Sequence, residues 1–176
     1  MRPKWNTARP DDEPYNPRPS KTRRKQTMDR HQQLGELLLR LKPAHWAALP
    51  VLESLLAALR EDARIHAQEA KRRHHQYIGK LMRQQDLDAL LDHLETVLPP
   101  PAKMTPLATT IQRLLQEGEK AVQETVQRLP GCDRSYLREL VESIQEADAQ
   151  SLSDESAEAQ HQLQLYLREM QLIQRF

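Results

Sequence analysis

The sequence has very little of what β-rich and disulfide-stabilised proteins need. Among its 176 residues are 4 glycines and 1 phenylalanine, and aromatic residues make up only 4%. Strands favour branched and aromatic side chains, whereas most apolar residues here are leucine and alanine, so the composition predicts an all-α protein. The single cysteine, Cys132, excludes an internal disulfide framework, and we expect it to be a reduced residue in a turn.

Long hydrophobic runs are also missing. No stretch approaches the roughly 18–20 consecutive apolar residues that cross a bilayer, and no apolar segment follows the charged N-terminus. These absences predict a cytoplasmic protein without a membrane partner. Hydrophobic residues make up 38% of the chain, which is little core material, so we expect thin helical cores.

Motifs for catalysis and metal binding are absent as well. There is no glycine-rich phosphate loop, no G-x-S-x-G elbow and no cysteine with a placed base. Although the chain has 7 histidines, His74 and His75 are adjacent and point apart on a helix, and no carboxylate stands at zincin spacing. Asp88 and Asp92 are i, i+4 partners that we expect to face water. We therefore expect no enzymatic activity, no cofactor, no metal and no small-molecule substrate.

Charge is abundant but unevenly divided along the chain. Residues 1–83 contain 18 Lys and Arg against 9 Asp and Glu, a net +9, whereas residues 84–176 contain 8 against 16, a net −8. Such asymmetry is typical of a nucleic-acid-facing part joined to a solubilising or protein-facing part. The alternative is that the two halves mainly attract each other.

Prolines and helical periodicity divide the sequence into three regions. Residues 1–22 contain five prolines and no apolar period, which predicts a flexible, Pro-rich basic arm that either follows a phosphate backbone or is a solvated tail. Residues 23–98 form a basic helical region with helices expected over 22–42, 49–83 and 86–98. Residues 104–175 form an acidic helical region with helices expected to start at Thr105, Asp133 and Ser153.

The segment 49–83 contains nothing that forces a helix to stop. Its apolar stripe predicts either one long helix or two nearly collinear helices with a kink near residues 62–67. A helix of 35 residues extends about 52 Å, more than the diameter of about 40 Å expected for a compact chain of this length. We therefore expect an elongated molecule with helices clustered around each end of a shared rod.

The stretch from Arg64 to Arg83 carries the strongest functional signal. It keeps helical apolar spacing through Ala67, Ala70, His74, Tyr77, Ile78 and Leu81, while Gln76 and Tyr77 also supply hydrogen-bonding and stacking groups. We count His74, Gln76 and Tyr77 among its RNA-binding candidates, and Gly79 predicts a close approach by a packed helix or a phosphate backbone. Its basic residues recur over about five turns: Arg64, Lys71, Arg72, Arg73, Lys80 and Arg83. This pattern favours a polyanion, and RNA first, with Tyr77 either stacking or packed. The alternative is a solvated basic face.

The acidic residues of the second half are expected on solvated helix faces. Docking to a basic protein, such as one on the ribosome, is the alternative reading of this region. Arg134, Arg138 and Arg168 stand out as basic residues against that acidic background.

Three segments of the sequence resemble a known family. Residues 69–83, with the sequence EAKRRHHQYIGKLMR, look like the signature of the DarP family, also called YjgA-type, of bacterial ribosome-associated proteins. The similarity continues through Asp133-Arg134 with Leu137-Arg138 and through Tyr166-Leu167-Arg168-Glu169, and it covers about residues 20–175. It implies an all-helical fold of two small bundles joined by long helices, without enzymatic activity.

The resemblance also implies a function. Members of this family associate with late precursors of the large (50S) ribosomal subunit and contact its rRNA, which promotes maturation of the peptidyl transferase centre. We therefore predict an assembly factor that binds large-subunit rRNA and pre-50S particles through the helix 64–83, with Arg134, Arg138 and Arg168 as further RNA-binding residues. Ribosomal proteins or other assembly factors are further expected partners.

Two other functions remain open from the sequence. The first is a helical protein-interaction adaptor that uses its acidic C-terminal half to hold a basic partner. The second is a DNA-binding helical protein, because a basic helix can contact duplex phosphates as well as RNA.

Overall fold

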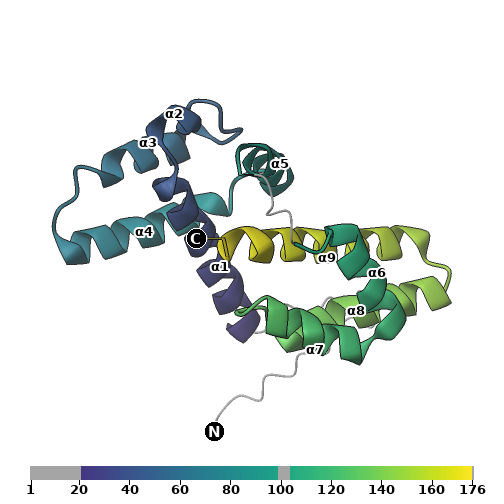
Figure 1. Cartoon of the computed structure of the whole chain (residues 1–176). Coiled ribbons are helices and arrows are strands. Elements are labelled where there is room, and N and C mark those ends of the chain that lie inside the picture. The colour runs from purple at the N-terminus through teal and green to yellow at the C-terminus, as the bar shows by residue number, and fades with distance from the viewer. Residues whose placement is uncertain (1–20, 99–103, 176) are drawn as a thin grey trace, which may run out of the picture.

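The computed structural model describes residues 21–98 and 104–175, and in these ranges it contains nine helices and no strand (Figure 1). The helices are α1 (Lys21–Arg40), α2 (Pro43–Trp46), α3 (Glu53–Asp62), α4 (Gln68–Met82), α5 (Leu87–Val97), α6 (Leu107–Glu117), α7 (Glu119–Arg128), α8 (Arg134–Ala149) and α9 (Ser153–Ile173). The predicted all-α class is confirmed. The expected arm, residues 1–22, lies outside the described ranges except for Lys21 and Thr22, which open α1. Within those ranges, no helix combines the length and the apolar character needed to cross a membrane.

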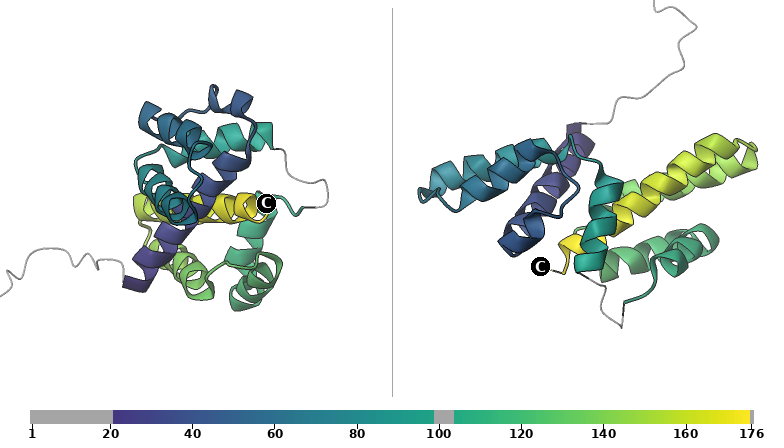
Figure 2. Two further views of the ribbon diagram at one scale, coloured as in Figure 1. Left: turned by 90° about the vertical axis from the view of Figure 1, so that its left-hand side faces the viewer. Right: turned by 90° about the horizontal axis from the view of Figure 1, so that it is seen from above.

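Two clusters of buried leucines divide the described chain into two lobes (Figure 2). The core of the first lobe lies among the C-terminal half of α1 and helices α2 to α5, with fully buried side chains such as Leu38, Leu59 and Leu91. The core of the second lobe lies among α6, α7, α8 and α9, around Leu114, Ile144 and others. This arrangement divides the limited apolar material between two small cores.

The two longest helices, α1 and α9, join the lobes. Helix α1 buries Leu34 and Leu38 in the first core, whereas its N-terminal turns reach the second lobe, where the Gln26 amide donates a hydrogen bond of 2.6 Å to Asp133. Helix α9 buries most of its apolar residues in the second core, but Leu172, near its end, packs into the first. The molecule is therefore two small bundles joined by long helices (Figure 1).

Arg30 of α1 links the two lobes where α1 and α9 meet. The Nε of Arg30 lies 3.0 Å from the Glu169 carboxylate of α9, and its guanidinium carbon lies 4.8 Å from the ring centroid of Tyr166 and 5.6 Å from that of Tyr136. Burial raises the pKa of Glu169, although Arg30 acts in the opposite direction. A buried carboxylate needs such a partner, so this pair fixes how α1 crosses the second lobe.

The prediction over 49–83, of one long helix or of two nearly collinear helices with a kink near residues 62–67, is wrong in both forms. Helices α3 and α4 instead fold back on each other as a hairpin (Figure 1). The Nε2 atom of His74 donates a hydrogen bond of 2.8 Å to the carbonyl oxygen of Ala58, and Nε2 of His75 lies 2.9 Å from the Asp62 carboxylate. Helices α3 and α4 each carry an apolar face, and a straight rod could not bury both faces in one small core. The turn at residues 63–67 brings both faces onto the first core.

A second expected helix is divided as well. The chain from Thr105 to Leu129 breaks at Gly118, which has a φ of +57° and separates α6 from α7. Thr105 is not the N-cap of α6, which begins after Pro106 without a side-chain cap. By contrast, the predicted cap of α8 is confirmed, since Oδ1 of Asp133 accepts a hydrogen bond of 2.6 Å from the backbone nitrogen of Tyr136.

Two glycines let α1 and α4 cross closely. A Cβ added to Gly35 on α1 would lie 2.6 Å from Cγ2 of Ile78, and one added to Gly79 on α4 would lie 3.0 Å from the Cα of Gln32. Of the two explanations for Gly79, helix packing is therefore the one that the structure shows. Since larger residues at either position would push the helices apart, the crossing fixes where α4 lies.

The substitution Gly35→Ala tests this crossing. Alanine has about 1 kcal/mol better helix propensity than glycine, but its methyl group would meet the stiff, buried Ile78, and overpacking costs about 1–3 kcal/mol. We therefore expect a net loss of about 1 kcal/mol in the free energy of unfolding, measured by urea denaturation with circular dichroism detection. Gln33→Ala, at an exposed position of the same helix, is the control and should change stability by less than about 0.5 kcal/mol. A stabilised Gly35→Ala protein would contradict the close crossing.

Candidate nucleic-acid interface

Helix α4 has one buried and one exposed side, and the exposed side is basic. Successive residues turn by about 100°, so Ile78, Gly79, Leu81 and Met82 meet on the side that packs against α1 and α3. The opposite side holds six exposed polar residues that we call the basic face: Arg72, Arg73, Gln76, Tyr77, Lys80 and Arg83. The sequence prediction placed all six in the site, and the structure brings them together. Packing of α4 thus determines which charges reach solvent.

The charges of the basic face are only partly neutralised. Glu69 binds both Arg72, at 2.8 Å, and Arg73, at 3.1 Å, and its pKa is lowered mainly by the hydrogen bond from Arg72. No residue in the described ranges forms an ion pair with Lys80 or Arg83. Exposed ion pairs contribute only about 0–1 kcal/mol, so a phosphate can replace Glu69 at little cost. The face is therefore available to an anion.

A groove runs beside the basic face. Its volume is about 330 Å³, it lies between α1 and α4, and Met28, Gln32, Gln76, Lys80 and Arg83 are among the residues that line it. Met28 and Arg83 also line a second groove, which continues along α1 toward Arg24 and α8. The basic surface thus extends from α4 onto the N-terminal turns of α1.

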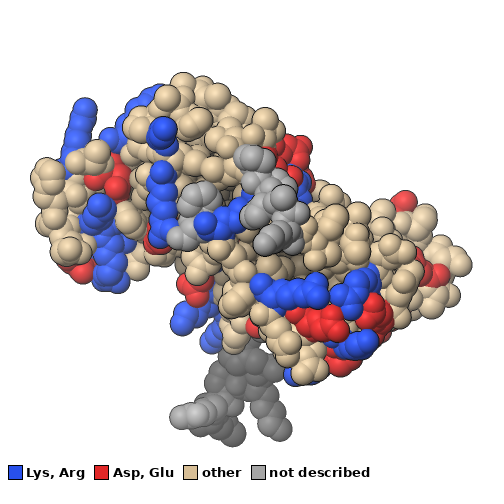
Figure 3. Space-filling model, in the orientation of Figure 1, with Lys and Arg blue, Asp and Glu red and all other residues tan. Residues whose placement is uncertain are grey.

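Arg24 is a residue that the sequence prediction left out of the site. The run Arg23-Arg24-Lys25 lies on α1, within the helix expected over 22–42, and Arg24 is exposed beside the second groove. The signal was present, because helical spacing from Thr22 onward already placed these residues in a helix. Figure 3 shows the charge pattern on one face of the molecule, with Lys and Arg protruding from the first lobe and mixed with Asp and Glu over the second.

Three of the predicted residues near α4 lie off the basic face. His74 is half-buried and holds α3 through its bond to Ala58, so its expected role next to RNA is replaced by a structural one. Lys71 faces the hairpin, with Nζ 3.7 Å from the Asp62 carboxylate. Arg64 lies in the turn before α4, where it is exposed and has no ion pair with a described residue. Of the three, Arg64 alone remains open to an anion.

Arg134 and Arg138 do not join the basic face. Both lie on α8, and the Nε atom of each lies 2.9 Å from the Glu119 carboxylate of α7. Their hydrogen bonds, that of Arg138 first, lower the pKa of Glu119 to about 2. These arginines connect α7 to α8 in the second lobe, so we leave them out of the proposed interface.

The prediction that Arg168 binds RNA is corrected by its burial. The residue is only 6% exposed, and its guanidinium reaches three carboxylates of α5: Asp92 at 2.5 Å, Glu95 at 2.8 Å and Asp88 at 3.8 Å. Burial alone would lower the pKa of Arg168, but the hydrogen bonds to Glu95 and Asp92 raise it overall. Arg168 therefore anchors α5 to α9, between the lobes.

The polar groups of this surface are mainly hydrogen-bond donors. The described residues contain no group of three or more His, Cys, Asp or Glu that could hold a metal ion. The exposed side of α4 offers guanidinium, ammonium and amide donors together with Tyr77, whose ring is 48% exposed. Such donors bind phosphates, and an exposed ring can stack on a base. The fold and this face define an all-helical, two-lobed protein with an exposed basic helix face.

Comparison with known proteins identifies the family. Residues 17–168 match the family model described as the dual-action ribosomal maturation protein DarP. The chain belongs to the DarP family. No solved structure matches it.

Three curated relatives illustrate the similarity, and each is named dual-action ribosomal maturation protein DarP. The protein from Vibrio vulnificus is 38% identical over 125 residues, which cover 69% of this chain and 67% of the relative. The protein from Nitrosomonas europaea is 42% identical over 132 residues, or 73% and 74% of the two chains. The protein from Vibrio atlanticus is 32% identical over 157 residues, or 87% and 88%. The match therefore extends through both lobes.

The reassignment of Arg168 can be tested by Arg168→Met. We expect this change to lower the free energy of unfolding by about 1–3 kcal/mol, because it removes charge-assisted hydrogen bonds while the exposed carboxylates of α5 remain hydrated. Binding to rRNA, measured by filter retention at a temperature where the variant is folded, should stay within about twofold of the original protein. A native melting curve with a large loss of RNA affinity would instead return Arg168 to the interface.

Proposed function

We propose that this protein is a ribosome maturation factor that binds large-subunit rRNA through the basic face of α4. In this proposal it acts in the cytoplasm on late precursors of the large (50S) subunit and promotes maturation of the peptidyl transferase centre. The observation that carries the proposal is the alignment of Arg72, Arg73, Lys80 and Arg83 on one exposed side of a helix whose other side packs against α1 and α3. The relatives are named ribosomal maturation proteins, and this name supports a role in ribosome maturation.

Structured RNA fits this face better than duplex DNA does. Tyr77 is exposed among the basic residues, and stacking on unpaired bases is typical of RNA recognition. Gln76 beside it can hydrogen-bond to a base edge or a ribose hydroxyl. A helix that reads the major groove of DNA needs no such ring, so Tyr77 favours looped or bulged RNA.

The adaptor alternative is weakened by how the acidic residues are used. Arg113 binds both Glu117, at 2.7 Å, and Glu124, at 2.7 Å. Glu119 is held by Arg134 and Arg138, as described above. A basic protein that binds here would have to compete with these arginines for three carboxylates of the second lobe.

The salt dependence of binding tests the proposal. If about five phosphates are contacted, the logarithm of the affinity for rRNA should fall with the logarithm of salt concentration with a slope near −4. Lys80→Glu should reduce the magnitude of the slope by about 1 and weaken binding to large-subunit precursors, because it removes one phosphate contact and adds repulsion. Sedimentation on sucrose gradients over a series of salt concentrations measures both effects.

The matched control is Lys120→Glu. Lys120 is also an exposed helical lysine, but it lies on α7 in the second lobe, so the same change of net charge should leave the slope unchanged. Equal effects of the two substitutions would point to long-range attraction rather than a site on α4. Binding that is unaffected by Lys80→Glu combined with Arg73→Glu, with a native circular dichroism spectrum, would remove α4 from the interface.

A further inference from the structure

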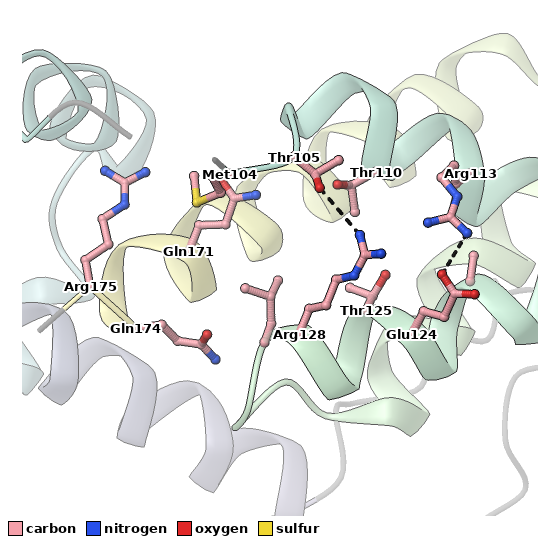
Figure 4. Close-up of a pocket in the computed structure, with 12 residues that line it drawn as sticks. Met104, Thr105, Thr110, Arg113, Glu124, Thr125, Arg128, Gln171, Gln174 and Arg175 are labelled. Atoms are coloured by element: carbon pink, nitrogen blue, oxygen red, sulfur yellow. Dashed lines mark hydrogen bonds and ion pairs between the residues drawn. The ribbon is translucent and has the colours of Figure 1, made fainter. Parts of the chain in front are cut away.

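The second lobe contains a cavity, with both polar and apolar lining, that the proposed RNA-binding face does not use. It has a volume of about 600 Å³ and lies among α6, α7 and the C-terminal end of α9 (Figure 4). Arg128 extends from α7 toward Thr105, and Gln171 and Gln174 approach from α9. A cavity of this size matches sites that hold a nucleotide or another small ligand.

The arginines that line this cavity differ in their hydrogen-bond and ion-pair partners. Arg113 is fully engaged by Glu117 and Glu124, but Arg128 has only a long hydrogen bond of 3.4 Å to the Thr105 hydroxyl. Arg175 donates from Nη1 to the carbonyl oxygen of Leu98 at 2.6 Å, while its Nε is buried and lacks a hydrogen-bond partner. Two cationic groups in one cavity therefore lack a carboxylate partner in the described ranges.

Arg175 is the less favourably placed of these two cations. Burial lowers its pKa, and only the nearby charge of Glu95 acts in the opposite direction. A partly buried guanidinium with an unpartnered nitrogen is unfavourable alone, and a bound phosphate would supply both a counter-charge and an acceptor. This argues for an anionic ligand rather than a neutral one.

The remaining lining suits a base. Met104 and Leu129 are apolar, and the amide of Gln171 can both donate and accept hydrogen bonds. The amide nitrogen of Gln174 already donates to the carbonyl oxygen of Pro130, so Gln174 offers mainly its oxygen as an acceptor. Amides of this kind can pair with the edge of a nucleobase, and an apolar side chain can lie against its face. The cavity thus combines apolar contact, amide groups and unpaired arginines.

We propose that this cavity binds one unstacked nucleotide unit of RNA, with phosphate on Arg128, a neighbouring phosphate on Arg175 and the base between Met104 and the two glutamines. This inference rests on the proposed function and adds a second RNA contact in the second lobe. In this proposal the second lobe binds a single strand of RNA while α4 binds structured rRNA. A free nucleotide offers the same chemistry, so the test separates the two sources.

The methionines provide a direct readout. Met104 lines the cavity and Met28 lines the groove beside Lys80, so ¹³C-methyl methionine NMR of the full chain reports both places at once. Met104→Leu and Met28→Leu assign the two signals. The probes are a nine-nucleotide oligouridylate, uridine 5′-monophosphate and inorganic phosphate.

We expect the oligouridylate to shift the Met104 signal at a lower concentration than uridine 5′-monophosphate does, which would identify a strand as the ligand. If the mononucleotide binds equally well, the cavity does bind a nucleotide unit, but its ligand is a free nucleotide and not an RNA strand. Arg128→Ala should weaken the Met104 response about tenfold, because a charge-assisted contact is lost. Lys120→Ala, on the same helix but outside the cavity, should leave it unchanged.

Three results would overturn the inference: an unmoved Met104 signal with oligouridylate, an equal shift with inorganic phosphate, or a full response in Arg128→Ala. Arg128 is exposed, so its removal should not prevent folding. The readout also separates this inference from the proposed function. Loss of the Met104 response alone contradicts the cavity, whereas a Met28 signal that ignores oligouridylate in the original protein counts against the α4 interface.

Discussion

The close crossing of α1 and α4 is the constraint on which the rest of the structure depends. Gly35 and Gly79 let the two helices approach almost backbone to backbone, which seats Ile78 and Met82 in the first core. Because that side of α4 is fixed, the opposite side must face solvent. Since α1 continues into the second lobe, where Arg30 pairs with the buried Glu169, the same crossing sets the position of the basic face relative to both lobes.

Charge has two separate uses in this molecule. Two arginines of α1 pair with carboxylates of the acidic half, Arg30 with Glu169 and Arg23 with Glu139, whereas Arg168 pairs with α5 inside that half. The halves do attract each other, as the alternative reading of the charge division held. The residues of α4 are oriented differently, because packing leaves Lys80 and Arg83 outside any such pair in the described ranges. Internal pairing and an outward basic face are therefore compatible.

The sequence predicted the fold class and most helix boundaries, because proline stops, Asp133 and a 3.6-residue period are local signals. Its RNA-binding candidates included the six residues that the structure brings together on the basic face. It did not predict the α3–α4 hairpin, since residues 63–67 contain neither proline nor glycine and the reversal is favoured by burial of two apolar faces in one core. Nor did it reveal the burial of Arg168, which depends on the tertiary approach of α5. Local periodicity shows which side of a helix is polar but not which charges find partners far along the chain.

The most direct test of the α4 interface is ultraviolet crosslinking of the protein to RNA on gradient-purified large-subunit precursors. Mass spectrometry then identifies the peptides that carry nucleotides. Tyr77 is exposed within the basic face and is a photoreactive reporter. We expect rRNA adducts on the α4 peptide that contains Tyr77, and we expect these adducts to be lost when Lys80 is changed to Glu. Protein that sediments with the precursors but carries adducts only outside residues 64–83 would contradict the central role of α4.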